Sequence, residues 1–414
     1  MKKLSNLPRK ARWAVPAGIV AAAGGLLAGS MVSAAAARPS LPPRTAAQLI
    51  AETAGKTPPP LAGTVVETAS LGMPALPSVV GTISLPSMLA GSHTINVWYT
   101  DPSHYRLALP QSMSESDVIR NGSNLWLWGS SANLVTHLAL PPGTTASPVP
   151  SLPLIPQQAA GQALTKAART TTLSVDSNVT VAGEAAYQLV LVPKSPSSLI
   201  GQVRIAIDAR HQVPLRVQVF ARGATSPALR IGFTSILFGK PAAANFAFRP
   251  PAGAAVVQEP TGSPGKAVGK AFGDDVTTRS VVIGNSWLAV ADLPETALSS
   301  LSGRGPSVKA DGPASGLFGH SSASAGRVGG SGGAALGIGT DVIFNAVLHS
   351  ANQVSGSWGT GRLLRTPLIS MLVTSNGRVF FGAVTPDVLY RAAAKARHAP
   401  PALWHHSASA GRSK

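Results

Sequence analysis

The chain of 414 residues contains no cysteine. This absence excludes disulfide bonds, a lipid-modified N-terminal cysteine and a thiol nucleophile. Any exported part of the chain must therefore be stabilised by burial of apolar side chains, which make up 44% of the sequence.

Acidic residues are also scarce, with 16 Asp and Glu against 34 Lys and Arg, which gives a net charge of +18. A charge of this size favours nucleic acid or an anionic membrane surface as a partner. The cations are densest near the two ends, from Lys2 to Arg12 and from Arg391 to Lys414. The middle has no dense basic run with interleaved aromatic residues, so we do not expect nucleic acid to bind.

Groups typical of catalysis and metal binding are scattered along the chain. The pair His405-His406 has no acidic residue nearby, whereas zinc needs three or four converging ligands. Asp274-Asp275 lacks a glycine-rich phosphate cradle, and we interpret it as a solvated turn. We therefore expect no enzyme, no metal site and no cofactor.

The N-terminal segment has the pattern of an export signal. After the basic residues that end at Arg12, the run Ala14 to Ala37 contains no charged residue, and small residues surround Ser33. The run is also long enough to cross a hydrocarbon core of about 30 Å as an uncleaved anchor. Its high Ala and Gly content favours the cleaved signal. In both cases residues 1–40 contact the cytoplasmic membrane and the chain after Arg38 is exported.

A first block of short strands follows a predicted helix over Leu41 to Ala54, with Thr45 as its N-cap. Within this block, the segment DVIRNGSNLWLWGS (Asp117 to Ser130) predicts a hairpin. Asn-Gly between apolar runs is the strongest short-range hairpin signal, because the central residues of that turn need positive φ. Trp126 and Trp128 are two residues apart, so both indoles lie on the same face of the predicted sheet.

A second predicted helix, Gln157 to Arg169, precedes a second block of strands. Apolar residues alternate with polar or charged ones in four successive segments, which are Tyr187 to Leu191, Val203 to Ile207, Leu215 to Val219 and Leu229 to Phe233. A period of two over four strands predicts an antiparallel sheet with one face in contact with water.

The composition changes after about Pro250. Residues Gly303 to Gly339 are mostly Gly, Ser and Ala and contain too few large apolar residues to fold alone. A β-rich segment follows, with a second Asn-Gly hairpin at Asn376-Gly377 and a short helix that starts at Thr385-Pro386. We interpret this region as a small C-terminal unit with an insertion.

The order and spacing of these segments resemble the lipoprotein-carrier (LolA) superfamily. This group includes the RseB-type envelope-stress regulators and the mycobacterial lipid-binding lipoproteins. The segments TAAQLIAETAGKTPPPLAGTVVET, SHTINVWYTDPSHYRLAL, ESDVIRNGSNLWLW, QVRIAIDARHQVPLRVQVFARGATSPALRIGFTSI and RLLRTPLISMLVTSNGRVFFGAVTP are similar to an actinobacterial, membrane-associated branch. The resemblance covers about Leu41 to Tyr390 and depends on all the segments together, since no single motif is specific.

The resemblance implies a mainly β (α+β) fold. We expect a curved antiparallel half-barrel sheet with covering helices, a small β-rich C-terminal unit and an N-terminal apolar helix. The expected boundaries are 1–40 for the signal or anchor, 41–258 for the half-barrel, 259–397 for the C-terminal unit with its insertion at about 303–339, and 398–414 for a disordered basic tail.

The resemblance also implies an apolar cavity that holds acyl chains, lipids or lipoproteins without covalent chemistry. The residues expected to line it are Tyr99, Trp126, Trp128, Leu189, Ile205, Val217, Ile231 and Phe233. Each buried CH₂ of a chain gains about 0.8 kcal/mol, so about ten methylenes bind without a polar anchor. The alternative is that these side chains close an ordinary core between sheet and helices.

Two functions from different classes follow from the sequence. The first is a lipid- or lipoprotein-binding protein on the outer face of the cytoplasmic membrane, for which local handling or sensing is favoured over shuttling because of the possible anchor and the C-terminal addition. The second is an envelope-stress or export regulator of RseB type, which contacts a membrane regulator or transporter and has a collapsed cavity.

Overall fold

A computed structural model of the chain describes residues 38–53, 56–71, 90–141, 170–259, 281–294 and 351–398. The chain divides into two compact units, 1–40 and 41–414, and every helix and strand described belongs to the second. The predicted apolar helix in 1–40, the predicted helix 157–169 and the insertion 303–339 lie outside the described residues. Of the helices that the structure does describe, none is long and apolar enough to cross a membrane.

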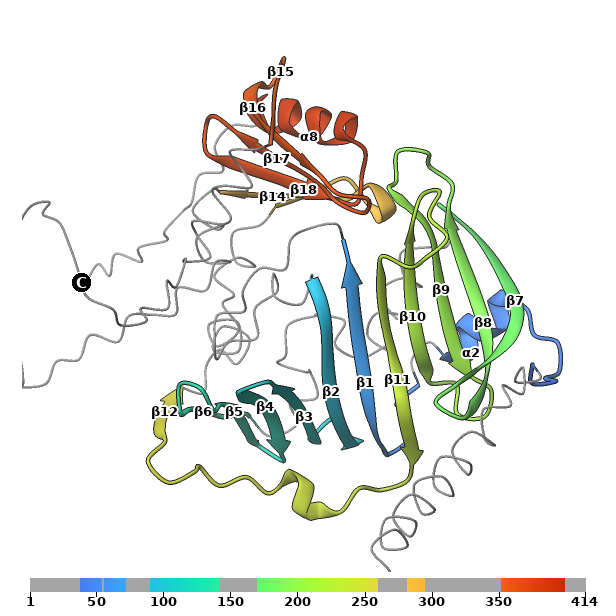
Figure 1. Cartoon of the computed structure of the whole chain (residues 1–414), viewed down its shortest axis with the longest axis vertical. Coiled ribbons are helices and arrows are strands. Elements are labelled where there is room, and N and C mark those ends of the chain that lie inside the picture. The colour runs from blue at the N-terminus through green and yellow to red at the C-terminus, as the bar shows by residue number, and fades with distance from the viewer. Residues whose placement is uncertain are drawn as a thin grey trace, which may run out of the picture. The chain divides into compact units, whose positions relative to one another are not determined.

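The larger of two sheets has twelve strands in the order β12-β6-β5-β4-β3-β2-β1-β11-β10-β9-β8-β7 (Figure 1). The strands are β1 (Leu61–Ser70), β2 (Ala90–Asp101), β3 (His104–Gln111), β4 (Ser114–Asn121), β5 (Asn124–Gly129), β6 (Leu134–Ala139), β7 (Thr171–Val181), β8 (Glu184–Pro193), β9 (Ile200–Asp208), β10 (Pro214–Ala221), β11 (Leu229–Phe238) and β12 (Ala255–Glu259). All neighbours pair antiparallel except β12, which runs parallel to β6. The sheet is curved and open, and the predicted mainly β, half-barrel fold class is confirmed.

The predicted hairpin at Asn121-Gly122 joins β4 to β5, but its turn is shifted by one residue. Asn121 pairs with Asn124, so Gly122 and Ser123 are the two central residues. Only Gly122 of these has positive φ, at 63°. Glycine at the first central position is typical of a type II′ turn, whereas the sequence predicted positive φ at Asn121 as well.

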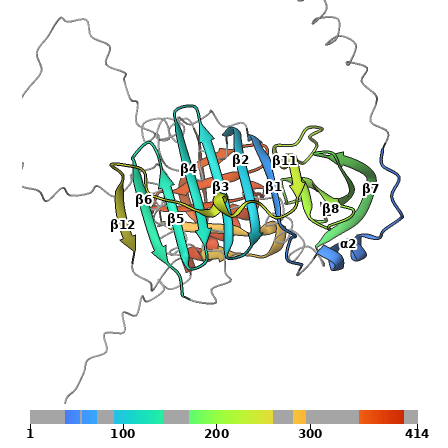
Figure 2. The same cartoon turned by 90° about the horizontal axis from the view of Figure 1, so that it is seen from below.

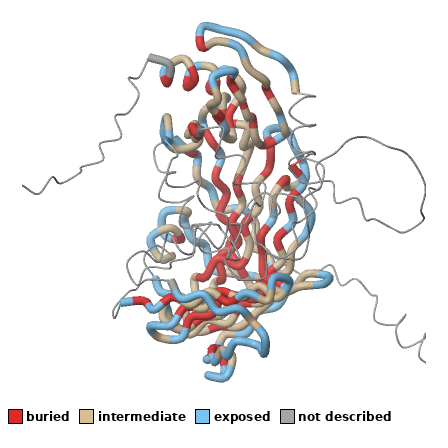
Figure 3. The backbone as a smooth tube through the Cα atoms, turned by 90° about the vertical axis from the view of Figure 1, so that its left-hand side faces the viewer, coloured by how far each residue is buried: buried red, intermediate tan, exposed pale blue. Residues whose placement is uncertain are grey.

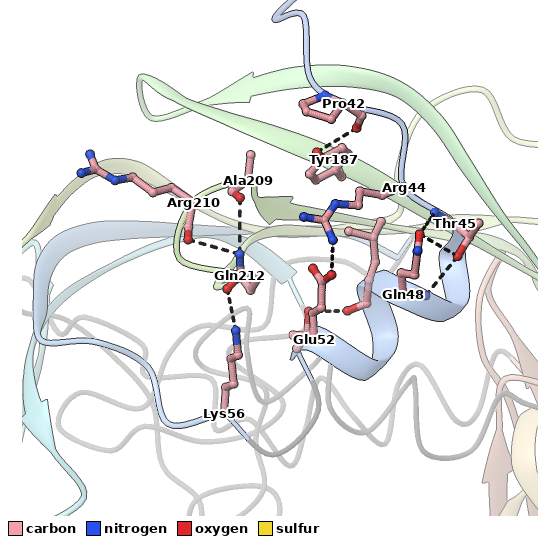
Figure 4. A network of polar contacts seen from close by, with 12 residues as sticks. Pro42, Arg44, Thr45, Gln48, Glu52, Lys56, Tyr187, Ala209, Arg210 and Gln212 are labelled. Carbon is pink, nitrogen blue, oxygen red and sulfur yellow. Dashed lines mark hydrogen bonds and ion pairs between the residues drawn. The ribbon is translucent and has the colours of Figure 1, made fainter.

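Helix α2 (Ala46–Thr53) is capped and fixed by side chains, as Figure 4 shows. The Gln48 amide donates to Thr45 Oγ1 at 3.2 Å and the Thr45 amide donates to Gln48 Oε1 at 2.9 Å, which is a capping box. The predicted N-cap is therefore confirmed. The Tyr187 hydroxyl donates to the Pro42 carbonyl at 2.9 Å and ties the segment before the helix to β8.

A long connection from β11 to β12, residues 239–254, crosses the strands β3 to β5 (Figure 2). We call it the strap. It contains the short 3-10 helix η2 (Ala243–Phe246), which packs on β3 and β4, and Phe246 is buried there. The strap ends where β12 pairs with β6.

The second sheet has six strands in the order β13-β14-β18-β17-β16-β15. These are β13 (Val281–Ile283), β14 (Val290–Pro294), β15 (Asn352–Gly356), β16 (Gly359–Arg365), β17 (Ser370–Thr374) and β18 (Arg378–Gly382), with the short 3-10 helix η3 (Ser286–Leu288) between β13 and β14. The predicted Asn376-Gly377 hairpin joins β17 to β18, and helix α8 (Pro386–His398) packs its apolar side on this sheet around Phe380 and Leu389. The described part of the chain is thus β-rich at its C-terminal end, as predicted.

Burial alternates along strands such as β1 and β5, whereas β4 and β8 contain runs of consecutive buried residues. Figure 3 shows how burial is distributed along the backbone. We call the face that carries Val65, Ile95 and Leu125 the core face, because these three side chains are fully buried. The opposite face, over which the strap passes, is called the strap face.

Candidate ligand-binding face

Six of the eight predicted site residues lie on the core face. Residues directly opposite each other in antiparallel strands point to the same side of a sheet. The pairs Leu61–Tyr99, Val65–Phe233, Val217–Ile231, Val217–Ile205 and Leu189–Ile205 therefore place all six on one face. The predicted members of this face are Tyr99, Leu189, Ile205, Val217, Ile231 and Phe233.

These six residues belong to two separate apolar clusters. Leu189, Ile205 and Val217 pack with Leu49 of α2, so a helix already covers their part of the core face. Tyr99, Ile231 and Phe233 belong to a larger cluster whose other members come from strands β1 to β11. Among the described residues, no helix contributes a side chain to this larger cluster, which we call the β1–β6 cluster.

Trp126 and Trp128 share a face, as predicted, but it is the strap face. In β5 the deeply buried residues are Leu125 and Leu127, and the two tryptophans between and after them are half-buried. Trp126 stacks on His137, with ring centroids 3.9 Å apart, and Phe248 of the strap lies against both indoles. The structure therefore separates the tryptophan pair from the other six predicted site residues.

A buried ion pair lies beside the tryptophans on the strap face. Arg106 Nη2 donates to Asp117 Oδ2 at 2.5 Å, and the Arg106 guanidinium lies 5.4 Å from the centre of the Trp98 ring. Burial raises the pKa of Asp117 to about 7, although Arg106 opposes this effect. Asp117 Oδ1 and Trp128 Nε1 are buried and have no hydrogen-bond partner among the described residues. This site was missed from the sequence.

Three buried polar residues interrupt the core face: Glu67 and Ser116 near one end of the strands, and Arg120, which pairs with Leu125, toward the other. Glu67 is 3% exposed, and its Oε2 lies 2.8 Å from His93 Nδ1, whereas its Oε1 has no partner in the described part of the chain. Ser116 is buried on β4, and its hydroxyl also lacks a partner among the residues described. At the other end of this face, Tyr99 is half-buried, and burial together with the charge of Asp101 raises its pKa to about 12.

A serine, a histidine and an aspartate meet in the turn between β2 and β3, but not as a catalytic triad. Ser103 Oγ and both Asp101 carboxylate oxygens all approach the same ring nitrogen of His104, Nδ1, at 3.0 to 3.1 Å. In a triad, the serine and the aspartate contact different nitrogens of the imidazole. The Ser103 hydroxyl also donates to Asp101 at 2.5 Å, so the three residues form a polar turn.

No group of three or more metal-ligating side chains occurs among the described residues. The predicted tail pair His405-His406 and the turn Asp274-Asp275 lie outside them. The described histidines His93, His104, His137 and His211 each contact a carboxylate or amide side chain.

The sequence matches no protein-family model and no curated protein. Among solved structures, the chain is similar to MucB, with 17% identity, a TM-score of 0.34 and coverage of 60% of this chain and 74% of that chain. It is also similar to the MucA/MucB complex of Pseudomonas aeruginosa, with 14% identity, a TM-score of 0.37 and coverage of 83% and 94%. A third match is the LolA superfamily protein NE2245 from Nitrosomonas europaea, with 10% identity, a TM-score of 0.22 and coverage of 50% and 99%.

The LolA superfamily, which the sequence resembles, is thus represented among the structures to which the chain is similar. With identities of at most 17% and TM-scores of at most 0.37, they transfer no ligand, partner or site residue to this chain. The function must therefore be argued from its own residues.

Proposed function

We propose that this protein is exported and binds acyl chains, either of lipids or of acylated proteins, on the core face of its large sheet without chemical conversion. The observation that carries the proposal is the β1–β6 cluster. It is a continuous apolar surface across the strands from β6 to β11, and no described helix packs on it. Export is supported by the signal-like pattern of residues 1–40.

The energy of binding comes from the apolar surface of the chain. About ten methylenes at about 0.8 kcal/mol each give about 8 kcal/mol, which corresponds to a dissociation constant of about 1 μM. Val65, Ile95 and Leu125 are already out of contact with water. An acyl chain can therefore bind on this face only if the packed side chains move apart, and the experiment below measures whether a chain binds.

The unpartnered atoms Glu67 Oε1 and Ser116 Oγ give the ligand a direction. Ser116 pairs with Leu109 on β3, and Glu67 pairs with His93 on β2, so both lie toward the same end of their strands. A buried carboxylate oxygen without a partner is costly and favours a ligand that donates a hydrogen bond. We propose that a polar head with an N–H or O–H group lies at this end and that the acyl chain extends toward Leu107 and Leu127.

The experiment has two measurements on the full chain. Organic extraction of the purified protein followed by mass spectrometry detects acyl chains that co-purify, and titration with a fluorescent fatty acid gives the affinity. The variant Leu127→Trp fills the core face and is expected to weaken binding about tenfold, since a tenfold change corresponds to about 1.4 kcal/mol.

The matched control is Leu364→Trp on β16 of the second sheet, a half-buried position, which is expected to leave the affinity unchanged. Phe233→Ala provides a second test that does not depend on whether the Leu127→Trp variant folds. It enlarges the space on the core face, so saturating fatty acid is expected to raise its melting temperature more than that of the original protein. A protein that carries no acyl chains and binds no fluorescent fatty acid refutes the proposal.

A second candidate function is regulation by protein contact. It is favoured by β13, an edge strand of the six-stranded sheet on which Val281 is 56% exposed and Val282 64% exposed. Exposed apolar edge strands accept a strand from a partner chain. A protein free of acyl chains whose β13 amides become protected from hydrogen exchange in the presence of a membrane regulator supports this second function.

A further inference from the structure

Three arginines lie close together on the strap face, on neighbouring strands away from the contacts of the strap with β3 to β5. Arg204 of β9 and Arg230 of β11 both pair with Gln218 of β10, so they belong to one row across the sheet. Arg216 of β10 lies in the next row, between Ala206 and Gly232. We call Arg204, Arg216 and Arg230 the arginine patch.

Gly232 allows the stem of Arg216 to lie flat against the sheet. A Cβ atom at this position would lie 2.9 Å from Arg216 Cγ, which is closer than real Cβ contacts. The guanidinium extends across β9 toward β8, where its Nη2 donates to Gln188 Oε1 at 3.4 Å. Arg216 is therefore held at the surface of the sheet by a neutral partner rather than by a carboxylate.

The positive charge of the patch is only partly compensated. Asp176 Oδ2 lies 4.0 Å from Arg204 Nη1, and in the part of the chain that the structure describes no carboxylate pairs with Arg216 or Arg230. The pKa of Arg216 is lowered by burial first, and then by the charges of Arg230 and Arg204, so the three cations repel one another. One anion against three cations leaves an excess of positive charge that a ligand can neutralise.

The patch presents its cations on three neighbouring strands rather than in one pocket. Neighbouring strands lie about 4.8 Å apart, so the backbones of Arg204 and Arg230, two strands apart, are separated by about 10 Å along the sheet. Arginine side chains at this spacing can reach adjacent lipid headgroups or share one small anion, and the phosphate arm of the test separates the two. Arg230 is exposed, and Thr68, which pairs with it on β1, has an exposed, neutral and small side chain.

We propose that the arginine patch docks the strap face of β9 to β11 onto an anionic lipid surface, where the guanidinium groups donate hydrogen bonds to headgroup phosphates. The planar guanidinium presents parallel N–H donors that match phosphate oxygens. The patch lies on the face opposite to Leu107, Leu127, Ile231 and Phe233, so this docking and acyl-chain binding use different residues, although Ala206 of the β1–β6 cluster pairs with Arg216.

The test measures co-sedimentation of the full chain with vesicles of phosphatidylcholine alone and with vesicles that contain about one third phosphatidylglycerol. Each basic residue near an anionic surface contributes about fivefold to binding. The variant R204Q/R216Q/R230Q is therefore expected to bind the anionic vesicles on the order of tenfold to a hundredfold more weakly than the original protein, with binding to neutral vesicles unchanged. Salt at about 1 M is expected to abolish the difference, because the Debye length falls to about 3 Å.

The matched control is R365Q/R391Q/K395Q, which removes the same charge from three exposed residues of the second sheet and α8. It is expected to lose less than half of the binding. Equal losses in both variants overturn the proposal, because they show that only net charge matters. Saturation of the patch by inorganic phosphate, with loss of vesicle binding, also overturns it in favour of a small-anion site. The single variant R230Q, at the exposed edge of the patch, supports the proposal if it folds as judged by circular dichroism and loses about fivefold.

Discussion

Asp117 is expected to make the stability of this protein depend on pH in an unusual direction. The side chain is buried on the strap face, beside Arg106 and opposite Trp128. Burial raises its pKa to about 7, whereas its reference value is 3.8. A carboxyl with a raised pKa holds its proton more tightly in the folded state than in the unfolded state.

The sign and size of the effect follow from these two pKa values. Below about pH 4, Asp117 is protonated in both the folded and the unfolded state, and its full contribution to the free energy of unfolding is present. Between about pH 4 and pH 7 only the folded state keeps the proton, so the free energy of unfolding falls as the pH rises. Each pH unit costs about 1.36 kcal/mol, which gives about 4 kcal/mol over the whole window.

The perturbation is Asp117→Asn, which keeps the shape and the oxygen that accepts from Arg106 but cannot ionise. Urea unfolding of both proteins at several pH values between 4 and 8 gives the free energy of unfolding. The difference between the two proteins is expected to change by up to about 4 kcal/mol across this window in favour of the variant at high pH. Groups that do not interact with Asp117 contribute equally in both proteins and cancel in the difference.

The matched control is Asp101→Asn. Burial raises the pKa of Asp101, but hydrogen bonds from Ser103 and His104 outweigh burial and leave it lowered. Asp101 is therefore ionised in both states above pH 5, so its own titration adds no change in stability from pH 5 to 8, and any pH dependence of this variant comes from the contact with His104. A free-energy difference for Asp117→Asn that is constant over this range refutes the reasoning, because it means that Arg106 keeps Asp117 ionised.

Three further substitutions test the packing of other regions. Arg378→Met removes the partner of the buried Asp292 carboxylate and is expected to cost about 3–5 kcal/mol, seen as a lower unfolding temperature and as faster hydrogen exchange in β14 and β18. Gly122→Ala meets no neighbour within 4 Å but keeps φ at +63°, so we expect a loss of about 1–2 kcal/mol in urea unfolding from backbone strain alone. Phe246→Ala empties a buried site under the strap, with an expected loss of about 3 kcal/mol and new proteolytic cleavage within 239–254, detected by mass spectrometry.

The strands and the helix α2 were predictable because each carries its signal locally. Alternation of Leu189, Ile205 and Val217 with polar neighbours fixes which residues share a face, and Thr45 with Gln48 marks the start of α2. The same local signals put Trp126 and Trp128 on one face, which the register confirms.

The choice of face for the tryptophan pair was not predictable. In β5, Leu125 and Leu127 are as apolar as the tryptophans, so alternation alone does not decide which pair enters the core. The decision depends on the strap, whose Phe248 contacts both indoles from a segment more than a hundred residues later in the chain. The strap is rich in Ala and Pro and has no periodic pattern, and the parallel pairing of β12 with β6 has no local turn signal either.

The strap also explains why arginines on one face of one sheet differ in their surroundings. Where η2 packs on β3 and β4, Arg106 is paired with a buried carboxylate, because a covered cation without a partner is strongly unfavourable. On β10 and β11, beyond these contacts, Arg216 and Arg230 keep solvent access and have no carboxylate partner among the described residues. On this face, the arginine near the strap contacts thus has a buried carboxylate partner, whereas Arg216 and Arg230 beyond these contacts have none in the part of the chain that the structure describes. Uncompensated positive charge is therefore found where the sheet is open to a binding partner. An arginine patch with a single carboxylate at an uncovered part of the sheet is thus a better marker of a contact surface than the net charge of the whole chain.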